Sequence, residues 1–127
     1  MMMKNAINWF EIPVKNFERA QKFYETLTQS EMQIMEMAGF EGKMAFFPVD
    51  SETGGVGGSI ISAPEYVPSQ AGVLIYLNGG EDLSKQLSRV EKAGGKVILP
   101  KTPIGENGFI AHFSDTEGNK IALHSTK

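Results

Sequence analysis

Residues 109–124 read FIAHFSDTEGNKIALH, and this stretch decides the fold. Apolar and aromatic residues dominate on both sides of a short polar loop, residues 115–119, that contains a glycine. Two such runs joined by a short glycine-containing loop are typical of a β-hairpin. The sequence therefore predicts two paired strands at the end of the chain.

The register of this hairpin decides where the only two histidines of the chain lie. Pairing Asp115 with Asn119 places His112 opposite Ala122 and puts His124 on the same face of the hairpin. A bulge in the loop would move one histidine to the other face. In the predicted register the opposite face is wholly apolar, which suits it to be covered by a helix. It carries Phe109, Ala111, Phe113, Ile121 and Leu123.

The hairpin ends an order of elements that occurs twice along the chain. Each half predicts a strand, an amphipathic helix and three further strands, and Asn16 is the expected N-cap of the first helix. The predicted βαβββ modules are residues 5–63 and 71–126, joined by a proline-containing linker at 64–70. The expected elements are strand 6–14, helix 16–28, three strands within 31–62, strand 72–77, helix 83–93, and strands 96–99, 109–114 and 120–124.

A helix can cover only one face of each sheet. The other faces stay wet unless the two sheets curve around a shared space. We therefore predict an α+β fold in which two tandem modules with curved mixed sheets enclose one cleft.

Composition excludes several classes of protein. The chain has 127 residues, enough for one compact unit, and a net charge of -3, which favours neither nucleic acid nor an anionic membrane as partner. There is no cysteine, which excludes disulfides and thiolate chemistry. No signal peptide or membrane span is recognised, so the expected location is the cytoplasm.

Three stretches carry a resemblance to a known family: WFEIPV at 9–14, KFYE at 22–25 and FSDTEGNKI at 113–121. With the duplicated order of elements, they closely resemble the glyoxalase, bleomycin-resistance and extradiol-dioxygenase superfamily, also called vicinal oxygen chelate proteins. The resemblance covers nearly the whole chain. It implies the fold predicted above and pairing into a homodimer.

The resemblance also implies a divalent metal, held by four side chains on the first and fourth strands of each module. These positions fall on Trp9, on the stretch 59–61, on Val73 and on Ala122, and none supplies a credible ligand. We therefore expect no cofactor and no metal ligands at these positions. A metal could be held only at a non-standard site, formed by Glu11, His112 and His124.

Those three residues are the candidate catalytic groups. Glu11 lies two residues from Trp9 and should share its face of the strand, and imidazole titrates near neutral pH, so general acid-base catalysis is open to them. The alternatives are that they bind a ligand, or that they are ordinary polar lining. The predicted ligand-binding residues are Trp9, Phe47, Val73, Ile75 and Ala122.

The leading hypothesis is a glyoxalase-like protein that binds a small, partly apolar molecule without the family's metal. The alternative is a lyase, isomerase or dioxygenase-type enzyme that uses Glu11 and the histidines. The glycine-rich stretch 54–58 lacks the lysine of a phosphate-binding loop and is expected to be a flexible hairpin or the entry to a strand. The polar connection 101–108 is either a plain connection before the next strand or a lid over the cleft.

Overall fold

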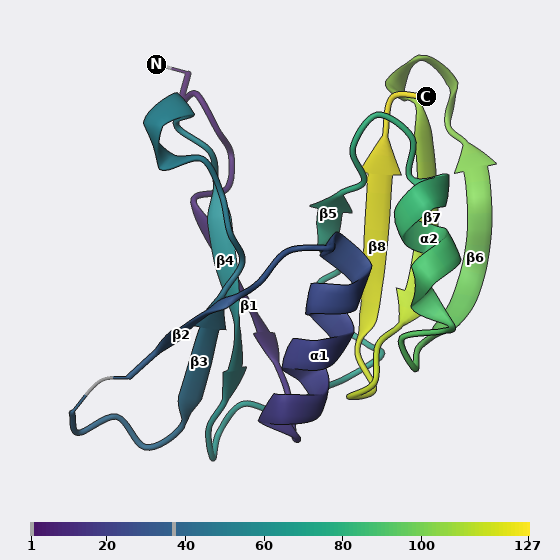
Figure 1. Ribbon diagram of the computed structural model, residues 1–127. Helices are drawn as coiled ribbons and strands as arrows, with labels where there is room; N and C mark the ends of the chain where they lie inside the picture. Colours follow the sequence, from purple (N-terminus) through teal and green to yellow (C-terminus); the bar gives the residue numbers. More distant parts are fainter. Residues whose placement is uncertain (1, 37) are drawn as a thin grey trace.

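The computed structural model describes residues 2–36 and 38–127, and in that part of the chain two four-stranded sheets pack with two α-helices (Figure 1). The first half contains β1 (Trp9–Pro13), α1 (Phe17–Thr28), β2 (Gln33–Met35), β3 (Lys43–Phe46) and β4 (Gly57–Ser62). The second half contains β5 (Tyr76–Asn78), α2 (Ser84–Val90), β6 (Lys96–Pro103), β7 (Phe109–Ser114) and β8 (Lys120–Ser125).

The two sheets have the same topology. Their strand orders are β1-β4-β3-β2 and β5-β8-β7-β6, and in each the first and last strands of the module pair in parallel while the other pairs are antiparallel. The predicted α+β fold with two βαβββ modules is confirmed. Neither described helix combines the length and the hydropathy that crossing a bilayer requires.

Helix α1 forms as the sequence predicts. The side chain of Asn16 accepts a hydrogen bond from the backbone N–H of Arg19 at 3.0 Å, which caps the first turn, and Gln29 ends the helix in the left-handed conformation. The residues recurring at helical spacing are all buried, namely Phe17, Ala20, Phe23, Tyr24 and Leu27.

One hydrophobic core joins both modules, and α1 lies at its centre. The ring of Tyr24 lies 5.4 Å from that of Phe47 in the first module, and the ring of Phe23 lies 5.8 Å from that of Phe113 in the second. Helix α2 adds Val90 to the same core, and its N-cap residue adds Leu83. The helices therefore cover one face of each sheet. Burial of the apolar side chains between helices and sheets stabilises both modules together.

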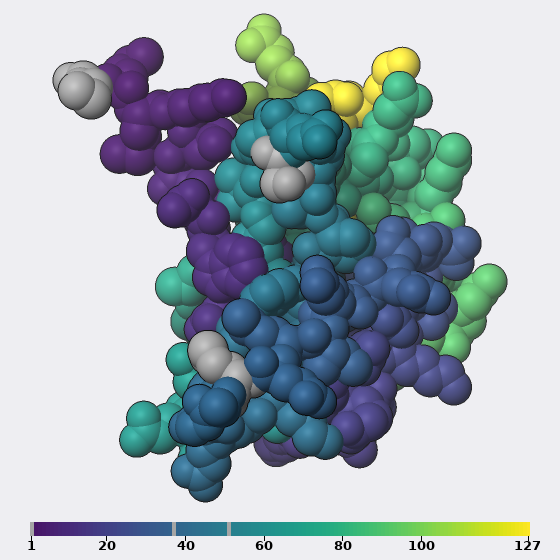
Figure 2. All heavy atoms as spheres, turned by 60° about the vertical axis from the view of Figure 1, so that its left-hand side comes forward, coloured from purple at the N-terminus to yellow at the C-terminus, as the bar shows by residue number. Residues whose placement is uncertain are grey.

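The faces of the sheets that point away from this core carry no helix. Trp9 of β1 and Tyr76 of β5 lie there, with 44% and 47% of their surfaces exposed. We call these surfaces the open faces of the two sheets. Figure 2 looks toward the first module, where the N-terminal segment lies beside the turn that precedes β4.

The strand expected at 72–77 is wrong at its start, because β5 begins only at Tyr76. Two neighbouring donors of β8 show why. The N–H of Lys120 bonds to the carbonyl of Ser69 at 3.3 Å, and the N–H of Ala122 bonds to that of Ile75 at 3.0 Å. Carbonyls six residues apart thus serve donors two residues apart, so residues 70–74 loop out. The connection between the modules is longer than the predicted 64–70.

The polar connection expected at 101–108 is also shorter than predicted. Strand β6 continues to Pro103, and residues 105–107 form one turn of 3₁₀-helix. The N–H of Ile104 bonds to the carbonyl of Gly108 at 2.8 Å, which closes the turn. What remains is a tight turn rather than a long lid.

The loop 115–119 of the β7–β8 hairpin binds the first module, and we call it the inter-module clamp. Carboxylate oxygens of Glu117 accept hydrogen bonds from the backbone N–H groups of Lys15 and Asn16, at 2.8 and 2.7 Å, and from the guanidinium of Arg19 at 2.6 Å. Burial favours a raised pKa for Glu117, but these donors lower it to about 2.

The other side chains of the clamp are equally well bonded. The hydroxyl of Tyr24 donates to Asp115 at 2.7 Å, and the amide of Asn119 donates to the carbonyl of Pro13 at 2.7 Å. Burial and the negative charge of Asp115 raise the pKa of Tyr24 well above its ordinary value. The motif that carried the family resemblance therefore has a structural role here, since it fixes the start of α1 to the second module.

Candidate functional site

The register predicted for the β7–β8 hairpin is confirmed. The N–H of Asp115 bonds to the carbonyl of Asn119 at 3.0 Å, His112 lies opposite Ala122, and Ile110 lies opposite His124. Both imidazoles are therefore on the open face of the second sheet. Tyr76 of β5 also pairs with Ala122, on its other side.

Tyr76 and His112 form a hydrogen-bonded pair across the buried Ala122. The hydroxyl of Tyr76 lies 3.2 Å from Nε2 of His112, and the two rings meet edge to face at 5.9 Å. Partial burial and, to a lesser degree, the positive charge of Lys120 lower the pKa of His112. The imidazole is thus mostly neutral at pH 7 and can exchange a proton or a hydrogen bond with a ligand.

His124 is held differently. Its Nε2 lies 2.6 Å from the backbone carbonyl of Asn107. A carbonyl only accepts, so Nε2 must carry a hydrogen, and Nδ1 of the neutral ring is an acceptor. His124, Tyr76 and Ile110 line a shallow hollow of about 760 Å³ on the open face.

The open face of the first sheet is aromatic. Trp9 packs edge to face against Phe46 at 5.4 Å, and the ring of Trp9 lies against Gly57, where an added Cβ would approach it to 3.4 Å. Ser59 lies next to Glu11 and Phe46 in the strand register. Its hydroxyl is fully buried and has no hydrogen-bond partner among the described residues.

The structure does not bring all the predicted site residues together in one chain. Glu11 lines a pocket of about 200 Å³ with Val73 and Ile75, whereas His124 lies in the hollow described above. Within residues 2–36 and 38–127, no group of three or more His, Cys, Asp and Glu residues is placed to hold a metal ion. Among these described residues, Glu11, His112 and His124 therefore do not form the relocated metal set, and Glu11 and His124 line different pockets.

Two of the predicted ligand-binding residues are placed where the sequence did not indicate. Val73 is 93% exposed, because it lies in the segment 70–74 that loops out. Phe47 lies on the helix-covered side, where its ring is 5.4 Å from that of Phe10. Trp9 and Ala122 do lie on the open faces.

The backbone register shows which positions of the modules are equivalent. The N–H of Val14 bonds to Ile61 and the N–H of Gly79 bonds to His124, each at 2.8 Å, so these pairs correspond. Five residues before Gly79 is Leu74, so counting along the chain makes Leu74 rather than Val73 the counterpart of Trp9, although Leu74 lies in the looped-out segment and not in β5. Leucine offers no ligand either, so the family's metal positions do not fit a divalent ion.

The sequence did not reveal the pairing of Tyr76 with His112. The hairpin register did contain a signal. Ala122 lies opposite His112 and has a small side chain, so a residue on the neighbouring strand can reach over Ala122 to His112. Finding it required the start of β5, which depends on the segment 70–74 looping out. The burial of Ser59 was missed for a similar reason, because it depends on the rings around it.

The chain matches a known protein family over most of its length. A family model described as "Glyoxalase/Bleomycin resistance protein/Dioxygenase superfamily" matches residues 6–123. The chain belongs to this superfamily. A glyoxylase-like domain-containing protein from Didymella fabae is 28% identical over 137 residues, covering 97% of this chain and 95% of the relative.

Several solved structures share the fold at low sequence identity. A hypothetical protein from S. aureus is 20% identical, with a TM-score of 0.64 over 98% of this chain and 95% of its own. The fosfomycin resistance protein FosX from Listeria monocytogenes is 14% identical, with a TM-score of 0.66 over 98% and 94%. Glyoxalase I from Zea mays is 19% identical, with a TM-score of 0.67, and this chain covers 97% of itself but 48% of that enzyme.

Proposed function

We propose that this glyoxalase-like protein binds a small, partly apolar molecule on the open faces of its sheets, without the metal of its superfamily. The observation that carries the proposal is the chemistry of the four inherited metal positions. Trp9, Ser59, Leu74 and Ala122 offer one hydroxyl and no nitrogen or carboxylate ligand. Aromatic rings occupy the same faces instead, and rings favour flat apolar ligands.

The proposed cleft is completed by a second copy of the chain. In one chain both open faces point away from the shared helical core, so each supplies one wall and lacks an opposite one. A two-fold dimer would place the first sheet of one copy against the second sheet of the other. The exposed aromatic and aliphatic side chains of the open faces, Trp9, Tyr76 and Ile98, are the surface that such pairing would bury.

Each polar group has a role in this proposal. Tyr76 and His112 would hydrogen-bond the ligand from one wall, and Glu11 would bond it from the other. His124 would offer its Nδ1 acceptor. Ligands that combine a flat apolar body with a few donors and acceptors fit this set.

The single tryptophan of the chain provides the test. Sedimentation should give a dimer, and the emission of Trp9 should move to longer wavelength on dilution as the ring becomes exposed. A protein that stays monomeric while Trp9 emission is independent of concentration would contradict the shared cleft. The variant Trp9→Phe supplies the fluorescence baseline.

Metal content tests the other half of the proposal. After dialysis against Zn²⁺, Mn²⁺, Fe²⁺ and Ni²⁺, the native protein should hold much less than one ion per chain. One tightly bound ion per chain, lost in a His112→Ala, His124→Ala variant, would overturn the metal-independent function.

An enzymatic role is the second candidate, and the lowered pKa of His112 favours it. A mostly neutral imidazole next to a tyrosine hydroxyl can accept a proton from a ligand at neutral pH. In an isomerase or lyase, His112→Ala should reduce turnover by at least about 100-fold, whereas Tyr76→Phe should reduce it less. In a binding protein, both variants should change only the ligand affinity, and by a modest factor.

A further inference from the structure

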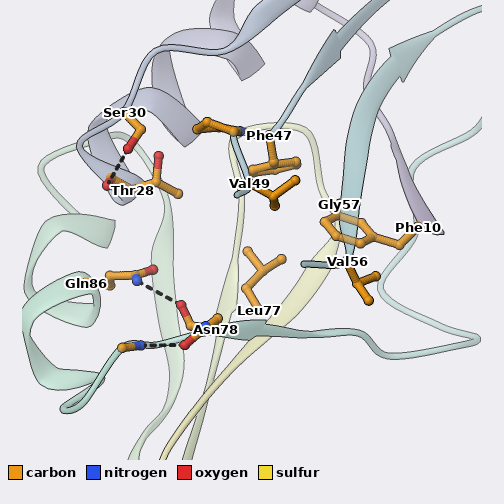
Figure 3. Close-up of a pocket in the computed structure, with 12 residues that line it drawn as sticks. Phe10, Thr28, Ser30, Phe47, Val49, Val56, Gly57, Leu77, Asn78 and Gln86 are labelled. Atoms are coloured by element: carbon orange, nitrogen blue, oxygen red, sulfur yellow. Dashed lines mark hydrogen bonds between the residues drawn. The ribbon is translucent and has the colours of Figure 1, made fainter. Parts of the chain in front are cut away.

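Another hollow lies on the helix-covered side of the sheets, between the two modules, and the proposed function does not use it. It has a volume of about 330 Å³ and lies at the C-terminal end of α1 (Figure 3). Phe10, Phe47 and Val49 come from the first module, and Leu77 and Gln86 from the second. We call it the inter-module pocket.

The pocket is built from rings packed on glycine. An added Cβ at Gly58 would approach the ring of Phe10 to 2.4 Å, so only glycine lets this ring lie flat on β4. Phe10 in turn packs against Phe47 at 5.4 Å. The glycine-rich stretch 54–58 thus shapes an apolar wall and is not a phosphate site.

None of the side chains that line the pocket is ionisable. Its polar groups belong to Thr28, Ser30, Asn78 and Gln86, and several already have partners. The hydroxyl of Thr28 donates to the carbonyl of Tyr24 at 2.8 Å, and Oδ1 of Asn78 accepts from the N–H of Gly80 at 2.8 Å. A charged ligand would find no opposite charge here.

One polar atom of the lining is unsatisfied. Nε2 of Gln86 donates to the backbone carbonyl of Asn78 at 2.9 Å, which fixes the orientation of the amide because a carbonyl only accepts. Oε1 of Gln86 must therefore point the other way, and it is buried with no partner among the described residues. A buried acceptor without a donor costs free energy that a ligand can recover.

We propose that the inter-module pocket binds a small, uncharged, mostly aromatic molecule that donates one N–H or O–H hydrogen bond to Oε1 of Gln86. The volume is near the lower limit for small-molecule sites, which fits one or two fused rings. The rings of Phe10 and Phe47 supply the aromatic contacts, and Gln86 selects for a donor.

Three naphthalene probes on the native protein test this without any variant. Amide NMR titration with 2-naphthol should shift resonances of Phe47, Leu77 and the Gln86 side chain. 2-Methoxynaphthalene, which lacks the donor, should bind about 3- to 10-fold more weakly, and 2-naphthoate should not bind. Equal affinity for the first two probes, or no shifts with any of them, would overturn the proposal.

Two variants sharpen the result. Gln86→Leu should make 2-naphthol and 2-methoxynaphthalene bind equally, and Val49→Trp, at a position that is 48% exposed, should fill the pocket and abolish binding. Unchanged binding in folded Val49→Trp protein would overturn the site. Shifts confined to Trp9 and His112 would also overturn it, and would instead support binding at the open faces.

Discussion

The two ends of α1 meet the second module in opposite ways. At its N-terminal end the inter-module clamp joins the modules through buried, fully bonded polar groups, with Glu117 receiving backbone donors from Lys15 and Asn16. At its C-terminal end the guanidinium of Arg89 donates to the carbonyl of Leu27 at 3.1 Å, and beside this contact the two modules leave the apolar inter-module pocket open. The contrast teaches that the clamp at the N-terminal end of α1 holds the modules together, while the C-terminal end of α1 leaves room for a ligand.

Removing the clamp carboxylate should have the largest effect. Glu117→Ala leaves two backbone N–H groups and the guanidinium of Arg19 without their acceptor, which should lower the free energy of unfolding by about 3 to 4 kcal/mol. Urea denaturation measures this. Glu18→Ala, which removes an exposed carboxylate paired with Lys43, is the control and should leave the midpoint unchanged. Equal effects of the two variants would mean that the clamp does not hold the modules.

Lowering the pH should have the second-largest effect on stability, because it removes the charge of Glu117 in the inter-module clamp. Folding lowers the pKa of Glu117 from 4.5 to about 2, so its contribution is complete above about pH 4.5 and is lost as the pH falls toward 2. The native protein should lose about 2 to 3 kcal/mol over this window through Glu117. Urea titrations at several pH values should show a shallower slope for Glu117→Gln. An identical pH dependence would assign the loss to other carboxylates.

Substitution of Gly58, the glycine beneath Phe10 in the pocket wall, should have an intermediate effect on the free energy of unfolding. Gly58→Ala drives a methyl group into the ring of Phe10 and should cost about 2 kcal/mol. The double variant Gly58→Ala, Phe10→Leu should cost less than the sum of the two single changes, because the smaller side chain relieves the clash. Strict additivity in thermal or urea unfolding would show that the ring can move aside.

Filling the pocket should have the smallest effect. Val56→Leu adds a methylene where the molecule has space, so the free energy of unfolding should change by less than about 0.5 kcal/mol. Ala111→Val, at a fully buried core position, should cost about 1 to 3 kcal/mol by overpacking. A large cost at Val56 would mean that the pocket end is as tightly packed as the core.

Local patterns explain how much of this was predictable. The α1 stripe and its Asn16 cap follow from helical spacing, and the β7–β8 register follows from a five-residue loop that pairs Asp115 with Asn119. The start of β5 was not predictable, because residues 70–74 are apolar enough for a strand and loop out only where β8 offers its donors to Ser69 and Ile75.

The candidate site was also predictable only in part from the sequence. The sequence by itself determined that no residue at Trp9, Ser59 or Ala122 can replace the superfamily's metal ligands, because ligand chemistry belongs to the side chain. Only the tertiary structure decided that Glu11 and His124 line different pockets, that Tyr76 reaches His112, and that Gln86 has an unpaired oxygen. These facts depend on which surfaces the shared core buries, and residues distant in sequence decide that together.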